Sequence, residues 1–139
     1  MKLTLQEVAL HPGKPAFAES AGYQFDSYWS DPNGLEATVT VYCVMKEEDG
    51  EARRDVARIS LDDRHEDMLE IALIDVREEE RHQGIAEWFI DQIKATFPDR
   101  TLGATPEEEL TGFWEELGWR RVEDPDELHG FKMLDPGAE

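Results

Sequence analysis

Six consecutive residues near the middle of the chain have the types and spacing of a phosphate-binding site. They are Arg81, His82, Gln83, Gly84, Ile85 and Ala86, and a helical pattern of apolar residues follows them. The first backbone N–H groups of a helix lack partners within the helix and lie at the positive end of its dipole, so they can bind phosphate oxygens. Gly84 and Ala86 add little bulk, which would let a diphosphate approach the backbone. An ordinary strand-to-helix loop has the same spacing and is the alternative.

Two carboxylates interrupt the apolar segment that precedes this motif, residues 68–76 (MLEIALIDV). The segment is typical of a central strand covered on both faces. An acid in such a strand is a candidate general base, because an ammonium group must lose a proton before it can attack. Glu70 and Asp75 are both candidates, and regular strand alternation would place them on opposite faces. The alternative for each is a solvent-facing or paired structural carboxylate.

The elements that position these residues follow from periodicity and turn signals. Apolar residues at spacings of three and four predict a helix from Ile85 to Phe97, which Pro98 ends. Strands are predicted at residues 3–8, 37–45, 56–61, 68–76, 101–104, 119–122 and 128–134. The order of strands and helices indicates an α+β or mixed α/β layer fold.

A second helix is predicted after the strand at 101–104. Residues 105–108 (TPEE) read as a capping box with proline at the first helical position. The apolar stripe that follows is expected to be buried; it consists of Leu110, Phe113, Trp114 and Leu117. Gly118 stands where a left-handed residue commonly ends a helix.

Two motifs resemble those of a known family. Arg81-x-x-Gly84-x-Ala86, after its strand, resembles the pyrophosphate motif (Gln or Arg)-x-x-Gly-x-(Gly or Ala) of the GNAT superfamily of N-acetyltransferases. Residues 113–119 (FWEELGW) are similar to that family's Phe-Tyr-Glu-Lys-Leu-Gly-Phe segment. The resemblance covers residues 68–122 well and the N-terminal third only by strand order. It implies one α+β (mixed α/β) domain over residues 1–139, with a mixed, mostly antiparallel central sheet and helices on both faces.

The resemblance also implies an enzyme that binds acetyl-CoA and transfers its acetyl group to a primary amine by direct attack in a ternary complex. Backbone amides of the phosphate motif would hold the pyrophosphate, with two basic side chains beside them; the amides are those of Gln83, Gly84, Ile85 and Ala86, and the side chains are Arg81 and His82. The pantetheine arm would pair with the end of the central strand, at Ile74, Asp75 and Val76. Glu70 is similar in position to a carboxylate base of some members.

The acceptor amine is expected to lie in the segment between the first two strands. In proteins that this chain resembles, that segment forms the acceptor wall, and here it carries Phe25, Tyr28 and Trp29. An aromatic wall with acidic neighbours suits a cationic amine.

One residue departs from the family pattern in a way that concerns turnover. The tyrosine that often protonates the leaving thiolate is replaced by Trp114, whose indole has no useful acid. Water or Tyr42 could take that role. The alternative function is a non-catalytic acyl-CoA-binding or regulatory module.

Composition narrows the choice of binding partners and of cellular location. The chain has 139 residues with 14 basic and 33 acidic side chains and a net charge of −19, which makes nucleic acid a poor partner. The acidic surface either aids solubility in concentrated salt or attracts cationic substrates. We expect a cytoplasmic protein without a membrane span or a metal site, and the single cysteine, Cys43, should be a buried small hydrophobe. The resemblance makes a homodimer possible.

Overall fold

The computed structural model describes residues 2–11, 13–17, 22–31 and 38–136. Its centre is a seven-stranded sheet in the order β1-β2-β3-β4-β5-β7-β6. Only the β4–β5 pair is parallel. The strands are β1 (Lys2–Val8), β2 (Val39–Glu47), β3 (Arg54–Asp62), β4 (Leu69–Val76), β5 (Leu102–Ala104), β6 (Arg120–Glu123) and β7 (Phe131–Leu134). The predicted strands are therefore all present, with ends shifted by a few residues.

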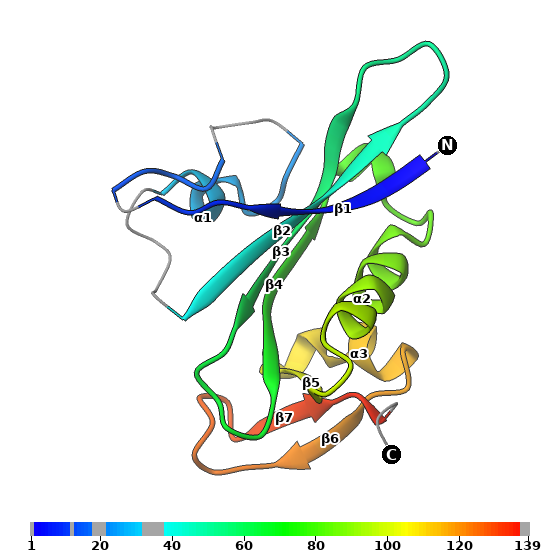
Figure 1. Ribbon diagram of the computed structural model, residues 1–139. Coiled ribbons are helices and arrows are strands. Elements are labelled where there is room, and N and C mark those ends of the chain that lie inside the picture. The colour runs from blue at the N-terminus through cyan, green and yellow to red at the C-terminus, as the bar shows by residue number, and fades with distance from the viewer. Residues whose placement is uncertain (1, 12, 18–21, 32–37, 137–139) are drawn as a thin grey trace.

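Helices cover both faces of the sheet (Figure 1). The short helix α1 (Asp26–Ser30) lies against one face, and α2 (Ile85–Thr96) and α3 (Thr111–Glu116) lie against the other. Two single turns of 3-10 helix, η1 (Glu78–Glu80) and η2 (Glu108–Leu110), precede α2 and α3. None of these helices is long and apolar enough to cross a membrane, as far as the described residues go. The predicted fold class is confirmed.

Two apolar clusters hold these layers together. The larger one joins the sheet to the wholly buried Phe89 and Ile93 of α2 and to Trp114 of α3. The smaller one, on the opposite face, is centred on Trp29 of α1 and on Val41 of β2. Cys43 is buried as predicted, and burial raises the pKa of its thiol to about 11.

A β-bulge in β4 changes which side chains share a face. Leu61 of β3 lies opposite Ile71, but the preceding Ser60 lies opposite Leu73, so Ala72 is an extra residue on β4. An extra residue reverses the alternation beyond it. Leu73 accordingly belongs to the α1 cluster, whereas Ile71 belongs to the α2 cluster. The expectation that Glu70 and Asp75 lie on opposite faces is therefore wrong, because the bulge brings both to the α1 face.

The second helix begins later than predicted. No side chain caps η2, whose N-cap residue is Glu107, and α3 starts only at Thr111. Thr105 does not form the predicted capping box, because its hydroxyl donates to Glu70 Oε2 across 2.7 Å. The predicted end of α3 is confirmed, since Gly118 is left-handed with φ 85°.

Candidate functional site

The candidate site is a cavity of about 630 Å³ at the point where β4 and β5 separate. These strands pair only at Leu69 with Leu102 and Glu70 with Gly103, after which β5 ends at Ala104. The remainder of β4, residues 71–76, forms one wall of the cavity, and the start of α2 and residues of η2 and α3 form the others. A strand edge without a neighbour leaves backbone groups available to a ligand.

The phosphate motif forms the loop that opens α2 and lines the cavity. Gly84 is the N-cap residue with φ 79°, and no side chain caps this helix in the part of the chain that the structure describes. The first helical hydrogen bond runs from Trp88 N to Gly84 O, so the N–H groups of the first turn are left for another partner. A Cβ at Gly84 would meet no atom within 4 Å, so the space in front of this backbone is open.

The side chains of the motif surround this helix start. Arg81 is held by a hydrogen bond from its Nε to Val76 O at 3.0 Å, at the end of β4. His82 has a positive φ of 65°, which is uncommon outside glycine. Both line the cavity with Gly84, Ile85 and Ala86, whereas Gln83 does not and instead donates to Glu79 O. A cationic side chain and free backbone donors at one cavity end fit a diphosphate.

The carboxylate of Asp75 ties the α1 segment to β4. It accepts hydrogen bonds from Gln24 N at 3.2 Å, Phe25 N at 2.9 Å and Trp29 Nε1 at 3.0 Å. All the donors come from one segment, and Asp75 is buried. Its side chain is therefore occupied in positioning the α1 segment, while Ile74, Asp75 and Val76 all line the cavity.

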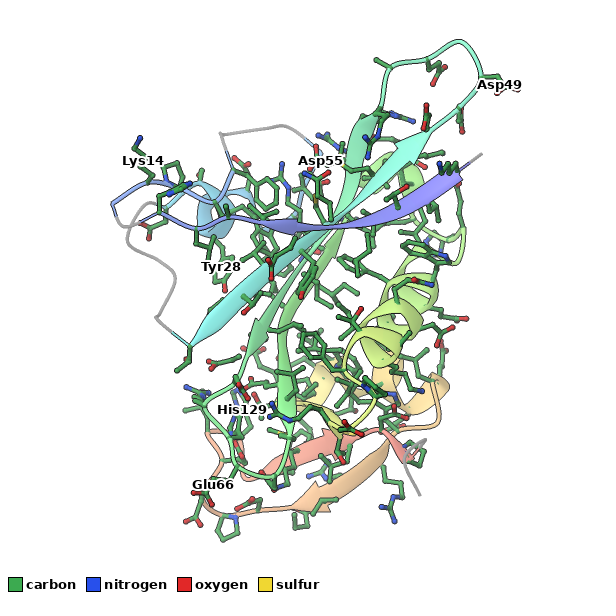
Figure 2. All side chains as sticks on the ribbon, in the orientation of Figure 1. Lys14, Tyr28, Asp49, Asp55, Glu66 and His129 are labelled. Carbon is green, nitrogen blue, oxygen red and sulfur yellow. The ribbon has the colours of Figure 1, made fainter. Side chains whose placement is uncertain are left out.

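The predicted aromatic wall is only partly in the cavity. Phe25 lines it, with Gln24 beside it. Trp29 is wholly buried behind that wall, because its indole bonds to Asp75 and packs against Tyr28 with ring centroids 4.9 Å apart. Tyr28 is half-buried between α1 and the sheet, where its hydroxyl donates to Ser60 Oγ and burial raises its pKa (Figure 2). The prediction that Trp29 and Tyr28 form the acceptor wall is therefore corrected: they lie behind Phe25, which alone of the three lines the cavity.

Glu70 is buried just behind the cavity and does not line it. Its Oε1 lies 2.6 Å from His65 Nε2 and 3.4 Å from an Arg64 guanidinium nitrogen. Its Oε2 accepts the Thr105 hydroxyl, and Thr105 does line the cavity. Sequence reasoning missed Thr105 and His65. The signal for them was Glu70 itself, since a buried carboxylate requires donors nearby.

The acidic run before the motif, residues 78–80 (EEE), is not wholly exposed to solvent. Glu80 is buried, and its carboxylate bonds to Lys46 Nζ at 2.7 Å and to an Arg54 guanidinium nitrogen at 2.6 Å. The hydrogen bond to Glu80 is the main reason that the pKa of Lys46 is raised. This carboxylate lines the cavity but is paired with cations, which reduces its repulsion of an anionic ligand.

No phenol reaches the cavity. Trp114 lines it where the family pattern has tyrosine, and the tyrosines of the chain number three: Tyr23, Tyr28 and Tyr42. None of them lines the cavity. Tyr42 packs against Phe97 at the C-terminal end of α2, with ring centroids 6.4 Å apart, whereas the cavity lies at the start of that helix, so Tyr42 is not placed to act as the acid. Within the described residues there is also no group of three or more His, Cys, Asp or Glu that could hold a metal ion.

No family model and no curated protein matches this sequence. Solved structures match its fold: the KacTA–DNA complex has a TM-score of 0.68 at 11% identity, covering 97% of this chain and 93% of that chain. A GNAT-family acetyltransferase from Staphylococcus aureus Mu50 has a TM-score of 0.55 at 13% identity, covering 70% and 67%. A mutant AtaT toxin bound to the C-terminus of the antitoxin AtaR and acetyl-CoA has a TM-score of 0.56 at 10% identity, covering 96% and 92%.

The chain has the fold of the GNAT acetyltransferases. The resemblance drawn from Arg81, Gly84 and Ala86 is confirmed at the level of the fold. In this GNAT fold the separation of β4 and β5 and the free start of α2 meet at one cavity. The fold therefore brings Arg81, Gly84 and Ala86 of the sequence motif together at this cavity.

Proposed function

We propose that this protein is an acetyl-CoA-dependent N-acetyltransferase that acts on a primary amine by direct attack, without a covalent enzyme intermediate. The observation that carries the proposal is the uncapped start of α2 opening into a cavity that continues along the unpaired edge of β4. Such a cavity offers phosphate-binding donors at one end and strand-like hydrogen-bonding groups further in. These are the two features that a diphosphate with an amide-containing arm requires.

Each part of the site has a role in this proposal. The backbone amides of Gly84, Ile85 and Ala86, with Arg81 and His82, hold the diphosphate, and residues 74–76 of β4 orient the pantetheine arm. Acetyl-CoA, when bound, supplies a thioester carbonyl for an amine to attack. Glu70 receives the proton that the acceptor ammonium must lose, and Phe25 packs against the acceptor.

The proposal is tested with two matched glycine variants. Gly84 and Gly50 have nearly equal φ values, 79° and 80°, and open space around them, but Gly50 lies in the β2–β3 turn. Glutamate at either position costs about 1–2 kcal/mol in the left-handed region, and only at Gly84 does it put a carboxylate against the diphosphate. Gly84→Glu should weaken acetyl-CoA binding at least tenfold in calorimetry, about 1.4 kcal/mol, and Gly50→Glu should leave it unchanged.

Two calorimetric results would contradict this assignment. One is the absence of heat with wild-type protein at high micromolar acetyl-CoA, since the free donors of α2 would then bind no diphosphate. The other is equal affinity in the two glycine variants, which would place the cofactor away from Gly84.

A second function, a non-catalytic acyl-CoA-binding module, is favoured by one observation. Trp114 occupies the place of a phenolic acid, and no tyrosine lines the cavity. Such a module would bind acetyl-CoA in calorimetry but would not consume the thioester with any amine in a panel. Release of free thiol above the amine-free rate identifies the enzyme instead.

The acceptor and the assembly belong to the proposal as well. We propose a small cationic amine or a peptide amine, because the chain carries a net charge of −19. One neighbour by fold is AtaT complexed with acetyl-methionyl-tRNAfMet and another is a KacTA–DNA complex. The acidic balance of this chain argues against an RNA or DNA partner for it. The proposal includes a cytoplasmic protein and allows a homodimer.

A further inference from the structure

Thr105 stands between the cavity and the carboxylate of Glu70. Glu70 is 5% exposed and does not line the cavity, whereas Thr105 is half-buried and does. The Thr105 hydroxyl donates to Glu70 Oε2 at 2.7 Å. An amine in the cavity would therefore reach the hydroxyl before it reaches the carboxylate.

We infer that Thr105 relays the proton of the acceptor ammonium to Glu70 and that His65 fixes the carboxylate that receives it. This inference rests on the proposed function and adds two residues to it. Thr105 is the catalytic residue of the pair, because it touches the substrate. His65 is a positioning residue, because it acts through Glu70.

The topology explains why the hydroxyl lies at this point. Glu70 and Gly103 are the last pair of the β4–β5 ladder, and Thr105 follows two residues later, where β5 has ended. The chain turns away into η2 after Pro106. Thr105 is thus the first side chain beyond the fork, the point where β4 and β5 separate, that is close enough to bond Glu70 and also faces the cavity.

The other oxygen of the carboxylate is held from the opposite side. His65 Nε2 lies 2.6 Å from Glu70 Oε1, and the ring also lies near Glu127, with 3.7 Å between His65 Nδ1 and Glu127 Oε1. An Arg64 guanidinium nitrogen is 3.4 Å from the same Oε1. We assign the proton between His65 Nε2 and Glu70 Oε1 to Nε2, so the 3.4 Å approach of Arg64 Nε to the same nitrogen is a contact and not a hydrogen bond. Oε2 is then left with the Thr105 hydroxyl as its bonded partner. The carboxylate plane is therefore set by donors at both oxygens.

The proton balance uses only groups present in this chain and the substrate. The ammonium N–H bond breaks, the nitrogen keeps the electron pair, and the proton forms a new bond to Thr105 Oγ1. The original hydroxyl proton moves at the same time to Glu70 Oε2. Thr105 changes from donor to acceptor toward Glu70, while the proton assigned to His65 Nε2 stays on that nitrogen, 2.6 Å from Oε1. The free amine then has the lone pair that attack on the thioester requires.

A purely structural role for Thr105, as the donor that satisfies a buried carboxylate, predicts a different pattern of rates. The distinction can be made with two nucleophiles and acetyl-CoA. Spermidine is an ammonium ion at neutral pH and needs a proton acceptor, whereas hydroxylamine is already unprotonated and does not. Loss of a proton relay would lower the acetylation rate of spermidine alone, whereas distortion of the site would lower the rates of both nucleophiles.

The experiment compares kcat of four variants with the wild type on both nucleophiles. Thr105→Val, which lacks the hydroxyl at the same size, should lower kcat with spermidine about 100-fold and leave the hydroxylamine rate unchanged. Thr105→Ser should restore the spermidine rate. His65→Gln, whose amide can still donate to Glu70, should lower the spermidine rate roughly tenfold, less than loss of the acid–base group itself. Thr96→Val, on the surface end of α2, is the matched control.

Any other result overturns either the relay through Thr105 or the proposed acceptor, as follows. Equal losses on both nucleophiles, or no loss in Thr105→Val, would overturn the relay and leave the proposed function intact. Wild-type protein that acetylates neither nucleophile would contradict a small cationic amine as the acceptor and would overturn the relay for it, while the Gly84→Glu calorimetry still tests acetyl-CoA binding separately. If Thr105→Val does not fold, the same comparison with His65→Gln decides, and equal loss on both nucleophiles overturns the inference.

Discussion

The carboxylates of β4 show how neighbours assign a role that sequence cannot. Glu70 and Asp75 are equivalent as acids inside an apolar strand, and both are buried. Among the described residues, the donors to Asp75 all belong to the α1 segment, whereas Glu70 accepts from a hydroxyl that faces the cavity. The sequence indicated that both residues were unusual, but the partners that distinguish them are far along the chain: Thr105 is 35 positions from Glu70, and Trp29 is 46 positions from Asp75. Only the pairing of β4 with β5 and with the α1 segment separates the structural acid from the candidate base.

Asp75 provides a stability prediction at the residue scale. In Asp75→Asn, the amide has one acceptor oxygen for three N–H groups and presents its own NH₂ to the rest. Leaving buried donors unsatisfied should lower the free energy of unfolding by about 3 kcal/mol, which urea denaturation measures. Asp49→Asn is the control, because Asp49 is exposed at the tip of the β2–β3 hairpin (Figure 2). It should change stability by less than about 0.5 kcal/mol, and a similarly small loss at Asp75 would contradict the anchoring role.

At the scale of elements, periodicity predicted the strands and α2 well but missed the irregular points that make the site. The bulge at Ala72 has no signature, since alanine fits a regular strand as well as a bulged one. The capping-box reading of Thr105 failed because a buried carboxylate competed for the same hydroxyl. Both departures lie at the fork of β4 and β5. Local rules fail most readily at functional sites, where long-range contacts decide.

The α3 helix gives a second such case and a prediction. Of its predicted buried stripe, Leu110 is 57% exposed and Phe113 38% exposed, and both line the cavity. Trp114 alone is buried, with its ring 4.6 Å from that of Trp119. Trp114→Ala should therefore cost about 3–5 kcal/mol, whereas Phe113→Ser, which removes one edge-on ring contact with Trp114, should cost only about 1 kcal/mol but weaken acetyl-CoA binding. Thermal unfolding and calorimetry separate these effects, and equal destabilisation would show that Phe113 belongs to the core.

At the scale of the whole molecule, the excess of acid is the dominant electrostatic feature. Ion pairs with carboxylates already engage nine basic side chains of the described residues: Lys46, Arg54, Arg58, Arg64, Arg77, Lys94, Arg100, Arg121 and Lys132. The net charge of −19 must therefore rest on carboxylates in excess of these pairs. Self-repulsion among them destabilises the compact state, and it is stronger in the folded chain, where the charges lie closer together.

Salt should therefore stabilise this protein, although it also weakens the surface ion pairs. The Debye length falls from about 30 Å at 0.01 M to about 8 Å at 0.15 M ionic strength, so repulsion between distant carboxylates is screened first. The Tm should rise steeply over that interval, by about 4 °C for each kcal/mol gained, and only slightly between 1 and 3 M sodium chloride. A parallel series in sucrose, which adds no ions, should show no steep low-concentration rise. An unchanged Tm from low to molar salt would mean that repulsion is not significant, whereas a steady rise up to 3 M would indicate preferential hydration of an acidic surface suited to concentrated salt.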